Sequence, residues 1–485
     1  MSAARADAQA ETASLPLQVD EVLAASATHF PSILEALARR RGAEGDALAS
    51  QGAFDLVFSV DGFDRVGGFY SGRTVESKVE QRLRPLGARI YGGYSISDGD
   101  FPIYEDQYFT NTGGEAKVGA ILSLLRDRSI DKERFNVIDA RLALRQADFD
   151  VLLTRVGVQH KALLAYWRWV AAGRQLTVYE RLSRIARDRQ AGLEEQVERG
   201  ARAAIFLTEN RQNITRRERL VAEAARDFDI AANNLSFYYR GANGEPVIPG
   251  RDRLPPDGVL DASEAEVAIG RAEPVAEALA DRPELEILRT AQERARRKVA
   301  LSENDLKPRL DVNAELSSDF GDVAEGGISR DSTDAVVGLR FSVPLQRRDA
   351  KGRLARARAE LEAVEQQRRR ARDEIELEIR NILVNLATSA RIARIAEQET
   401  TQAEAMENAE RQRFASGASD FFLVNVREET TADARIRELL AQLEIRLARA
   451  NYDASTVDLE RLGIADAAAI APPAASVAEW PEPAR

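Results

Sequence analysis

The chain has 485 residues, of which 44% are hydrophobic, 30% are charged and only 6% are aromatic. This composition favours long helices packed along narrow seams, because compact globular cores usually hold more large aromatic residues. A net charge of -11 argues against wholesale binding of nucleic acid phosphate, and the absence of cysteine excludes disulfides and thiolate metal sites. The two histidines, His29 and His160, lie far apart in the sequence, which argues against a histidine metal site or catalytic triad.

The N-terminal segment, residues 1–14, is expected to be a disordered or processed remnant. Ala8-Gln9-Ala10 has the small-residue form of a signal-peptide cleavage site, but the segment lacks the charged and apolar regions of a signal peptide. We therefore expect the sequence to start inside a longer precursor, or its leader to have been trimmed. No apolar run approaches the roughly 18 residues of a membrane-spanning helix.

Two similar halves follow, and the first is predicted to span residues 15–240. It opens with a short helix over residues 19–41, followed by two segments of alternating apolar and polar residues, 54–61 and 88–97. Residues 61–87 are predicted to form an unusually long loop between these segments, and an extension of the strands is the alternative. A very long helical stretch then runs to a break at Gly200, and another helix runs back to about Asn234.

The densest aromatic cluster lies within this long helical stretch and includes Tyr166, Trp167 and Trp169. Its position favours packing between helices, and His160 beside it is predicted to be structural. Residues 241–280, rich at their start in Gly, Pro and Asp, are predicted to form an irregular connector.

The second half, residues 281–465, repeats this plan. A helix runs to about Asn304, alternating segments cover residues 309–317 and 337–343, and a long helix extends over about residues 350–414. A break at Gly417 is followed by a helix that ends near Asn451. The tail, residues 466–485, is rich in Ala and Pro and is predicted to be disordered.

The four alternating segments carry the most structural information. Each has about 8–10 residues, close to the ~9–11 of a tilted transmembrane strand, and separates apolar from polar side chains by face. Two interpretations are open at this point: a membrane β-barrel, and a soluble antiparallel sheet with one face on a core. Four strands cannot close a barrel, whereas three chains of four strands each would supply twelve.

The long helix of the second half carries an apolar stripe. Its apolar residues recur mostly at spacings of three, four or seven, as in a coiled-coil seam. At 1.5 Å per residue, roughly 65 residues would extend about 100 Å. The returning helix is shorter, so we expect the short helix before each strand pair to stack on its end and complete the hairpin. Hairpins of this length indicate a tunnel rather than an enzyme domain.

Several short motifs occur in a duplicated order. They are Pro31-Ser32-Ile33, Arg282-Pro283-Glu284-Leu285, Leu306-Lys307-Pro308-Arg309-Leu310, Phe341-Ser342-Val343-Pro344-Leu345 and the segment Phe414 to Phe421. Together they resemble the outer-membrane efflux protein family, of which TolC is the best-known member, over about residues 15–462. The resemblance implies a mainly α protein with a small membrane β-barrel part. It also implies a homotrimer with a twelve-stranded barrel in the outer membrane and a twelve-helix tunnel across the periplasm of a Gram-negative cell.

The resemblance further implies the passive exit duct of a tripartite efflux or type I secretion system, with no catalytic residue, cofactor or metal. Its partners would be outer-membrane lipid, a HlyD-type periplasmic adaptor and, through the adaptor, an inner-membrane pump that is either an ABC transporter or proton-driven. No nucleic acid partner is expected. The sequence specifies neither the cargo nor the particular pump.

The resemblance also places two glycine turns at the periplasmic tip, where the adaptor docks. The residues concerned are Gly200, Ala201, Gly417, Ala418, Ser419 and Asp420. Each glycine can adopt the positive φ that reverses a helix, and Asp420 can cap the returning helix. The alternative is that each glycine only kinks a continuous helix.

Many family members carry aspartates six and nine positions after the tip glycine, where they form a selectivity ring. Here those positions hold Leu423 and Val426, so the sequence departs from the family pattern. The nearby polar candidates for a pore constriction are Asn425, Glu428 and Glu429. The alternative for the two glutamates is an ordinary solvated position on a helix.

Two other classes of protein compete with the duct. A cytoplasmic coiled-coil scaffold would explain the helical stripes but not alternating segments at equal points of two repeats. A periplasmic adaptor of an export system would carry one long hairpin between β-rich domains, whereas this chain is predicted to carry two hairpins. No nucleophile motif, phosphate loop or metal-ligand spacing supports an enzyme.

Overall fold

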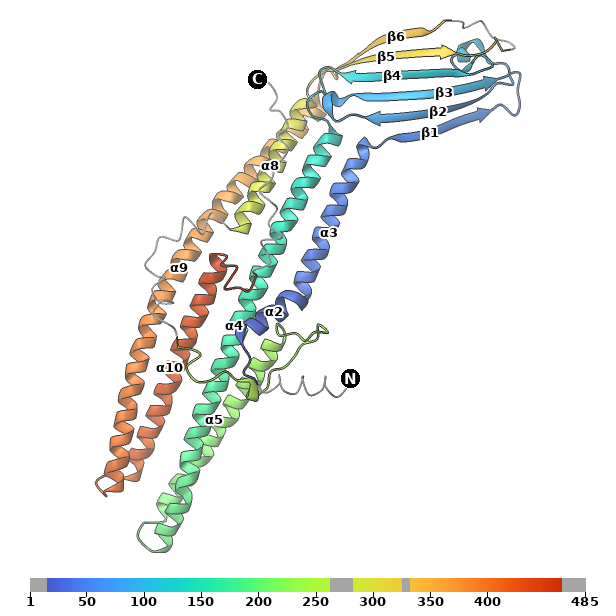
Figure 1. Ribbon diagram of the computed structural model, residues 1–485. Coiled ribbons are helices and arrows are strands. Elements are labelled where there is room, and N and C mark those ends of the chain that lie inside the picture. Colours follow the sequence, from blue (N-terminus) through green and yellow to red (C-terminus); the bar gives the residue numbers. More distant parts are fainter. Residues whose placement is uncertain (1–14, 262–281, 325–331, 465–485) are drawn as a thin grey trace. The chain divides into compact units, whose positions relative to one another are not determined.

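A computed structural model describes residues 15–261, 282–324 and 332–464 (Figure 1). The predicted N-terminal remnant, the cleavage-site residues, the tail and the later part of the predicted connector lie outside these residues. The chain divides into two compact units. The described residues within 1–38, 149–286 and 370–471 form a helical unit, and those within 39–148 and 287–369 form a unit that contains the sheet.

Seven α-helices account for most of the described residues. They are α2 (Val19–His29), α3 (Pro31–Gln51), α4 (Lys132–Glu198), α5 (Ile205–Ser236), α8 (Pro283–Asn304), α9 (Arg348–Ala415) and α10 (Phe421–Ser455). Helices α4 and α9 have 67 and 68 residues, so each extends about 100 Å. None of the described helices combines the length and the apolar composition needed to cross a membrane.

The helix predicted over residues 19–41 is in fact two helices, and the second continues to Gln51. Phe30 separates them in an extended conformation, with φ -74° and ψ 125°. The cause is Pro31, which disfavours a helical conformation at the residue before it and has no N–H to continue the first helix. Proline is well suited to the first position of the second helix, where an N–H would lack a partner in any case.

The sheet has six antiparallel strands, each paired with the next along the chain, and not the four that the sequence predicted. They are β1 (Val57–Asp64), β2 (Arg73–Arg82), β3 (Arg89–Asp98), β4 (Glu115–Ser123), β5 (Arg309–Asp319) and β6 (Asp334–Ser342). Strand β2 lies within the predicted loop 61–87. It escaped prediction because Val75 and Val79 are its only large apolar residues, so period-two alternation is hardly visible.

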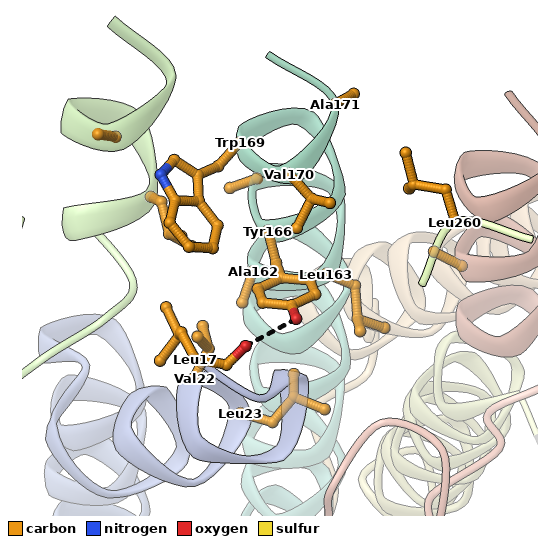
Figure 2. Close-up of a cluster of buried hydrophobic side chains, with 14 of the residues drawn as sticks. Leu17, Val22, Leu23, Ala162, Leu163, Tyr166, Trp169, Val170, Ala171 and Leu260 are labelled. Carbon is orange, nitrogen blue, oxygen red and sulfur yellow. Dashed lines mark hydrogen bonds between the residues drawn. The ribbon is translucent and has the colours of Figure 1, made fainter. Parts of the chain in front are cut away.

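A cluster of buried hydrophobic residues stabilises the helical unit (Figure 2). Tyr166 and Trp169 of α4 pack here with Phe228 of α5, and the Tyr166 hydroxyl donates a 2.9 Å hydrogen bond to the carbonyl of Leu17. The prediction that these aromatic residues pack between helices is therefore confirmed. His160 is also structural, since its Nε2 lies 2.7 Å from Oδ1 of Asn451 on α10.

Candidate functional site: two helix turns and a two-faced sheet

Both long helices of the helical unit reverse direction at a glycine. Gly200 follows α4 with φ +72°, and Gly417 follows α9 with φ +76°. The turns share one hydrogen-bond pattern: each glycine N–H bonds the carbonyl three residues back, and the next alanine N–H bonds the carbonyl five residues back. This pattern is the Schellman motif, in which a left-handed residue ends a helix. The predicted reversals are therefore present, and the alternative of a kinked continuous helix is wrong.

The two turns differ in how the returning helix begins. Asp420 accepts a 2.8 Å hydrogen bond from the backbone N–H of Leu423 and so caps α10, as predicted. Ala204 precedes α5 and provides no side-chain cap. Around the turns, Gly200, Ala201, Gly417, Ala418 and Asp420 are exposed, whereas Ser419 is half-buried and donates a hydrogen bond to Glu410. Their role in adaptor docking stays a prediction.

An aromatic cluster joins the residues that follow the two turns. The ring of Phe421, which is fully buried, lies 6.0 Å from Phe206 and 6.3 Å from Phe414. The Arg202 guanidinium lies 4.7 Å from the centre of the Phe414 ring and 5.5 Å from that of Phe206. These contacts hold the two helical hairpins together near their ends, because each hairpin contributes at least one ring.

A buried carboxylate, Glu428 of α10, lies between all four helices of these hairpins. Arg217 of α5 donates to it at 3.0 Å and Arg411 of α9 at 3.3 Å, and Arg189 of α4 donates a third bond. The side chains of Glu428 and Arg217 are fully buried, and Arg217 also donates to the carbonyl of Leu182 at 2.9 Å. One carboxylate thus links three arginines from three different helices.

The charges of this network are stable in the protein interior only because Glu428 and the arginines are paired. Burial lowers the pKa of Arg217 from its usual value, and the negative charge of Glu428 opposes that shift. An arginine or a glutamate buried here without its partner would be costly, because the interior cannot solvate a lone charge. The network therefore couples the packing of the first hairpin to that of the second.

The three predicted constriction residues lie in or beside this network. Asn425 is buried and accepts a 2.7 Å hydrogen bond from Arg189, and Glu429 pairs with Arg216. The interpretation of Glu428 as an ordinary solvated residue is wrong, since its side chain has no exposed surface. A role of these three residues in narrowing a pore stays a prediction.

The arginines of the network, Arg189, Arg217 and Arg411, were not among the residues predicted from the sequence. Helical periodicity holds a signal for Arg217. The buried residues Asn210, Arg217 and Ala224 of α5 are seven residues apart, which is the repeat of a packed seam. A charged residue at such a seam position requires a buried partner.

The register of the sheet places apolar residues of every strand on one face. Val75 of β2 faces Gly62 of β1 and Ile96 of β3, and the same side carries Val118 of β4 and Leu316 of β5. It continues on β6 with Val337, Leu339 and Phe341. These side chains are uncovered: Val337 is 76% exposed and Leu339 is 73% exposed. We call this surface the apolar face.

The opposite surface, the polar face, is held together by charged pairs. Glu76 of β2 pairs with Lys117 of β4, and Arg89 of β3 pairs with Glu80 of β2 at 3.4 Å. Tyr91 donates to Glu315 of β5 on the same side. A sheet with one face on a protein core would cover its apolar side and leave its polar side to water. Here it is the apolar side that is uncovered.

Comparison with known proteins agrees with this architecture. Residues 275–462 match the sequence model of the outer membrane efflux protein family. No curated protein matches the chain in sequence.

Solved structures of outer-membrane channels share the fold. The outer membrane protein VceC from Vibrio cholerae superposes with a TM-score of 0.64 at 15% identity, covering 90% of this chain and 96% of that one. The MtrE outer membrane channel of Neisseria gonorrhoeae, in its open state, superposes with a TM-score of 0.62 at 13% identity. The match covers 90% of this chain and 88% of that one. The CmeC outer membrane channel of Campylobacter jejuni superposes with a TM-score of 0.60 at 12% identity. The match covers 92% of this chain and 89% of that one.

The long paired helices and the small antiparallel sheet described above are therefore the elements of a fold that this chain shares with solved outer-membrane channels. Residues 275–462 are thus similar in sequence to the outer membrane efflux protein family, and the chain shares the fold of solved outer-membrane channels over most of its length. The predicted resemblance to this family and the predicted mainly α fold with a small sheet are confirmed.

Proposed function

We propose that three copies of this chain form a passive exit duct through the outer membrane of a Gram-negative cell. The observation that carries the proposal is the separation of the two faces across all six strands of the sheet. An uncovered apolar surface of this extent needs an apolar environment. The strands have 8–11 residues, a length that suits the hydrocarbon layer of a membrane.

The number of strands follows from how the sheet must close. Strands β1 and β6 are the two edges of the sheet, and open edges are not viable in lipid. We expect β6 of one copy to pair with β1 of the next. Three copies of six strands supply eighteen strands rather than the twelve expected from the family. The polar face then lines the channel and the apolar face meets lipid.

The helical unit supports the proposed connection of the duct to an adaptor. Its two hairpins end in matched turns whose residues are exposed, and such turns offer a surface for a HlyD-type adaptor. The adaptor would connect the duct to an inner-membrane pump that supplies the energy. The uncovered apolar face argues against a cytoplasmic scaffold. The two hairpins argue against an adaptor, for which one hairpin is expected.

Neighbouring residues of β6 provide a matched test. Val337 lies on the apolar face and Val336 on the polar face, so V337R and V336R place the same charge on opposite sides. An arginine facing lipid near the middle of the membrane costs about 2–4 kcal/mol. We expect V337R to lose trimer from the outer-membrane fraction, and V336R to keep it. Equal recovery of both variants, or a wild-type chain that stays monomeric without detergent, would overturn the proposal.

A further inference from the structure

The segment between β3 and β4, residues 99–114, folds back over the sheet. Thr110 accepts a 3.0 Å hydrogen bond from the N–H of Ser97, and its own N–H donates to the Ser97 hydroxyl at 2.8 Å. The N–H of Asn111 donates to Asp319 of β5 at 3.0 Å. The register places both Ser97 and Asp319 on the polar face. The segment is thus hydrogen-bonded to residues of the polar face on two strands, β3 and β5.

Residues 99–114 also contact β1 through aromatic side chains. Phe63, which also points to the polar face, packs edge to face against Phe101 at 6.4 Å and Tyr108 at 5.3 Å. Glu105 of the segment pairs with Arg65, whose guanidinium lies 5.9 Å from the Phe63 ring centre. The segment therefore reaches back over β2 and β1 from its own position after β3.

Burial confirms which face is covered. Thr74 and Ser97, on the polar face of β2 and β3, are each 7% exposed. Their neighbours on the apolar face, Val75 and Ile96, are 50% and 42% exposed. In a sheet without a cover, the exposures on the two sides would be more alike. The segment shields the polar face and leaves the apolar face open.

We propose that residues 99–114 form an inward-folded constriction of the duct, at the mouth where the strands join one another and not the helices. This inference rests on the proposed function, in which the polar face lines the channel. An eighteen-stranded barrel is wide enough to leave an open aqueous channel, so its mouth stays broad unless something narrows it. Three copies of the segment narrow it, and Ile103 and Tyr104, 94% and 81% exposed, form their tips. The constriction limits the size of cargo that leaves.

A cysteine introduced at the tip tests this position, since the chain has no cysteine of its own. The Y104C trimer is inserted in a planar lipid bilayer and treated with a maleimide carrying a polymer of about 5 kDa. We expect the ion current to fall by at least half, because three polymers attached inside the mouth obstruct the ion path. The matched control is F69C in the β1–β2 loop. Phe69 is 93% exposed and lies outside residues 99–114, so its conjugation should reduce the current clearly less than that of Y104C.

The outcomes separate this inference from the proposed function. Complete labelling of Y104C with an unchanged current, or an equal loss of current for both variants, would overturn the constriction while leaving a conducting duct intact. An unlabelled wild-type trimer that carries no current would instead count against the duct itself. Mass spectrometry establishes the extent of labelling, and resistance of the trimer to detergent shows that each variant has assembled.

Discussion

The helical unit buries charged side chains, whereas the sheet exposes apolar side chains. In the helical unit, Glu428 and Arg217 are fully buried and are bonded to each other. In the sheet, Val337 and Leu339 stand more than 70% exposed while charged pairs cover the other side. A buried pair specifies how helices pack, because each charge needs its partner. An uncovered apolar face specifies the surroundings of the sheet instead. The conformation of the helical unit is thus determined by packing within the chain. The conformation of the sheet depends on the medium that surrounds its apolar face.

The largest effect should come from removing the central carboxylate of the helical unit. We expect E428A to lower the free energy of unfolding by about 3–5 kcal/mol, because Arg217 would stay buried without a partner. The matched control is E429A. The Glu429 side chain is 28% exposed and pairs with Arg216, which is 48% exposed, so about 0–1 kcal/mol is expected. Chemical denaturation of the two variants in the same detergent measures the difference. Equal losses would show that burial does not distinguish the two pairs.

A smaller effect is expected at the tip turn. Nothing lies within 4 Å of a Cβ added at Gly417, so G417A meets only the strain of its φ of +76°, about 1–2 kcal/mol. Gly192, within α4, also has open space around it, and its φ is not positive. There, G192A should stabilise the protein by about 0.5–1 kcal/mol. Thermal melting should thus shift in opposite directions for the two variants.

The same turn sharpens the functional assignment. We expect a bulkier residue at Gly417, as in G417V, to impair export while the trimer still assembles, because the exposed turn is the proposed docking surface. Export assays in cells and the recovery of trimer from membranes measure the two properties separately. Normal export by a G417V trimer would contradict the assignment of this turn to docking.

The helix cap after Gly417 should contribute about 1 kcal/mol. D420A removes the acceptor of the Leu423 N–H and should lower the free energy of unfolding by about 0.5–2 kcal/mol. D420N keeps an oxygen in place and should lose much less. A similar melting temperature for D420A and the wild type would mean that water satisfies the N–H equally well.

The smallest effect is expected on the polar face of the sheet. The side chains of Glu76 and Lys117 are 34% and 22% exposed, so the charge of their pair is partly screened. E76Q should therefore change stability by about 0–1 kcal/mol. A loss as large as that of E428A would show that this pair is as isolated from water as the helical network, and the contrast between the two regions would fail.

The sequence by itself determined the features that depend on residues close together along the chain. The apolar stripes predicted the long helices. The two glycines predicted the turns, because only a residue without a Cβ adopts positive φ at little cost. The alternation in four segments revealed four of the six strands. It also indicated the apolar face, since a period of two fixes which side chains share a side.

Only the tertiary structure decided the features that join distant residues. The strand β2 is identified by its pairing with β1 and β3, because its own side chains are mostly polar on both sides. Arg217 and Glu428 are 211 residues apart, and no local pattern states that they meet. The segment 99–114 could equally project into solvent, until contacts with Phe63 and Asp319 bring it over the polar face. Such contacts depend on how the chain folds back on itself, which local spacing does not encode.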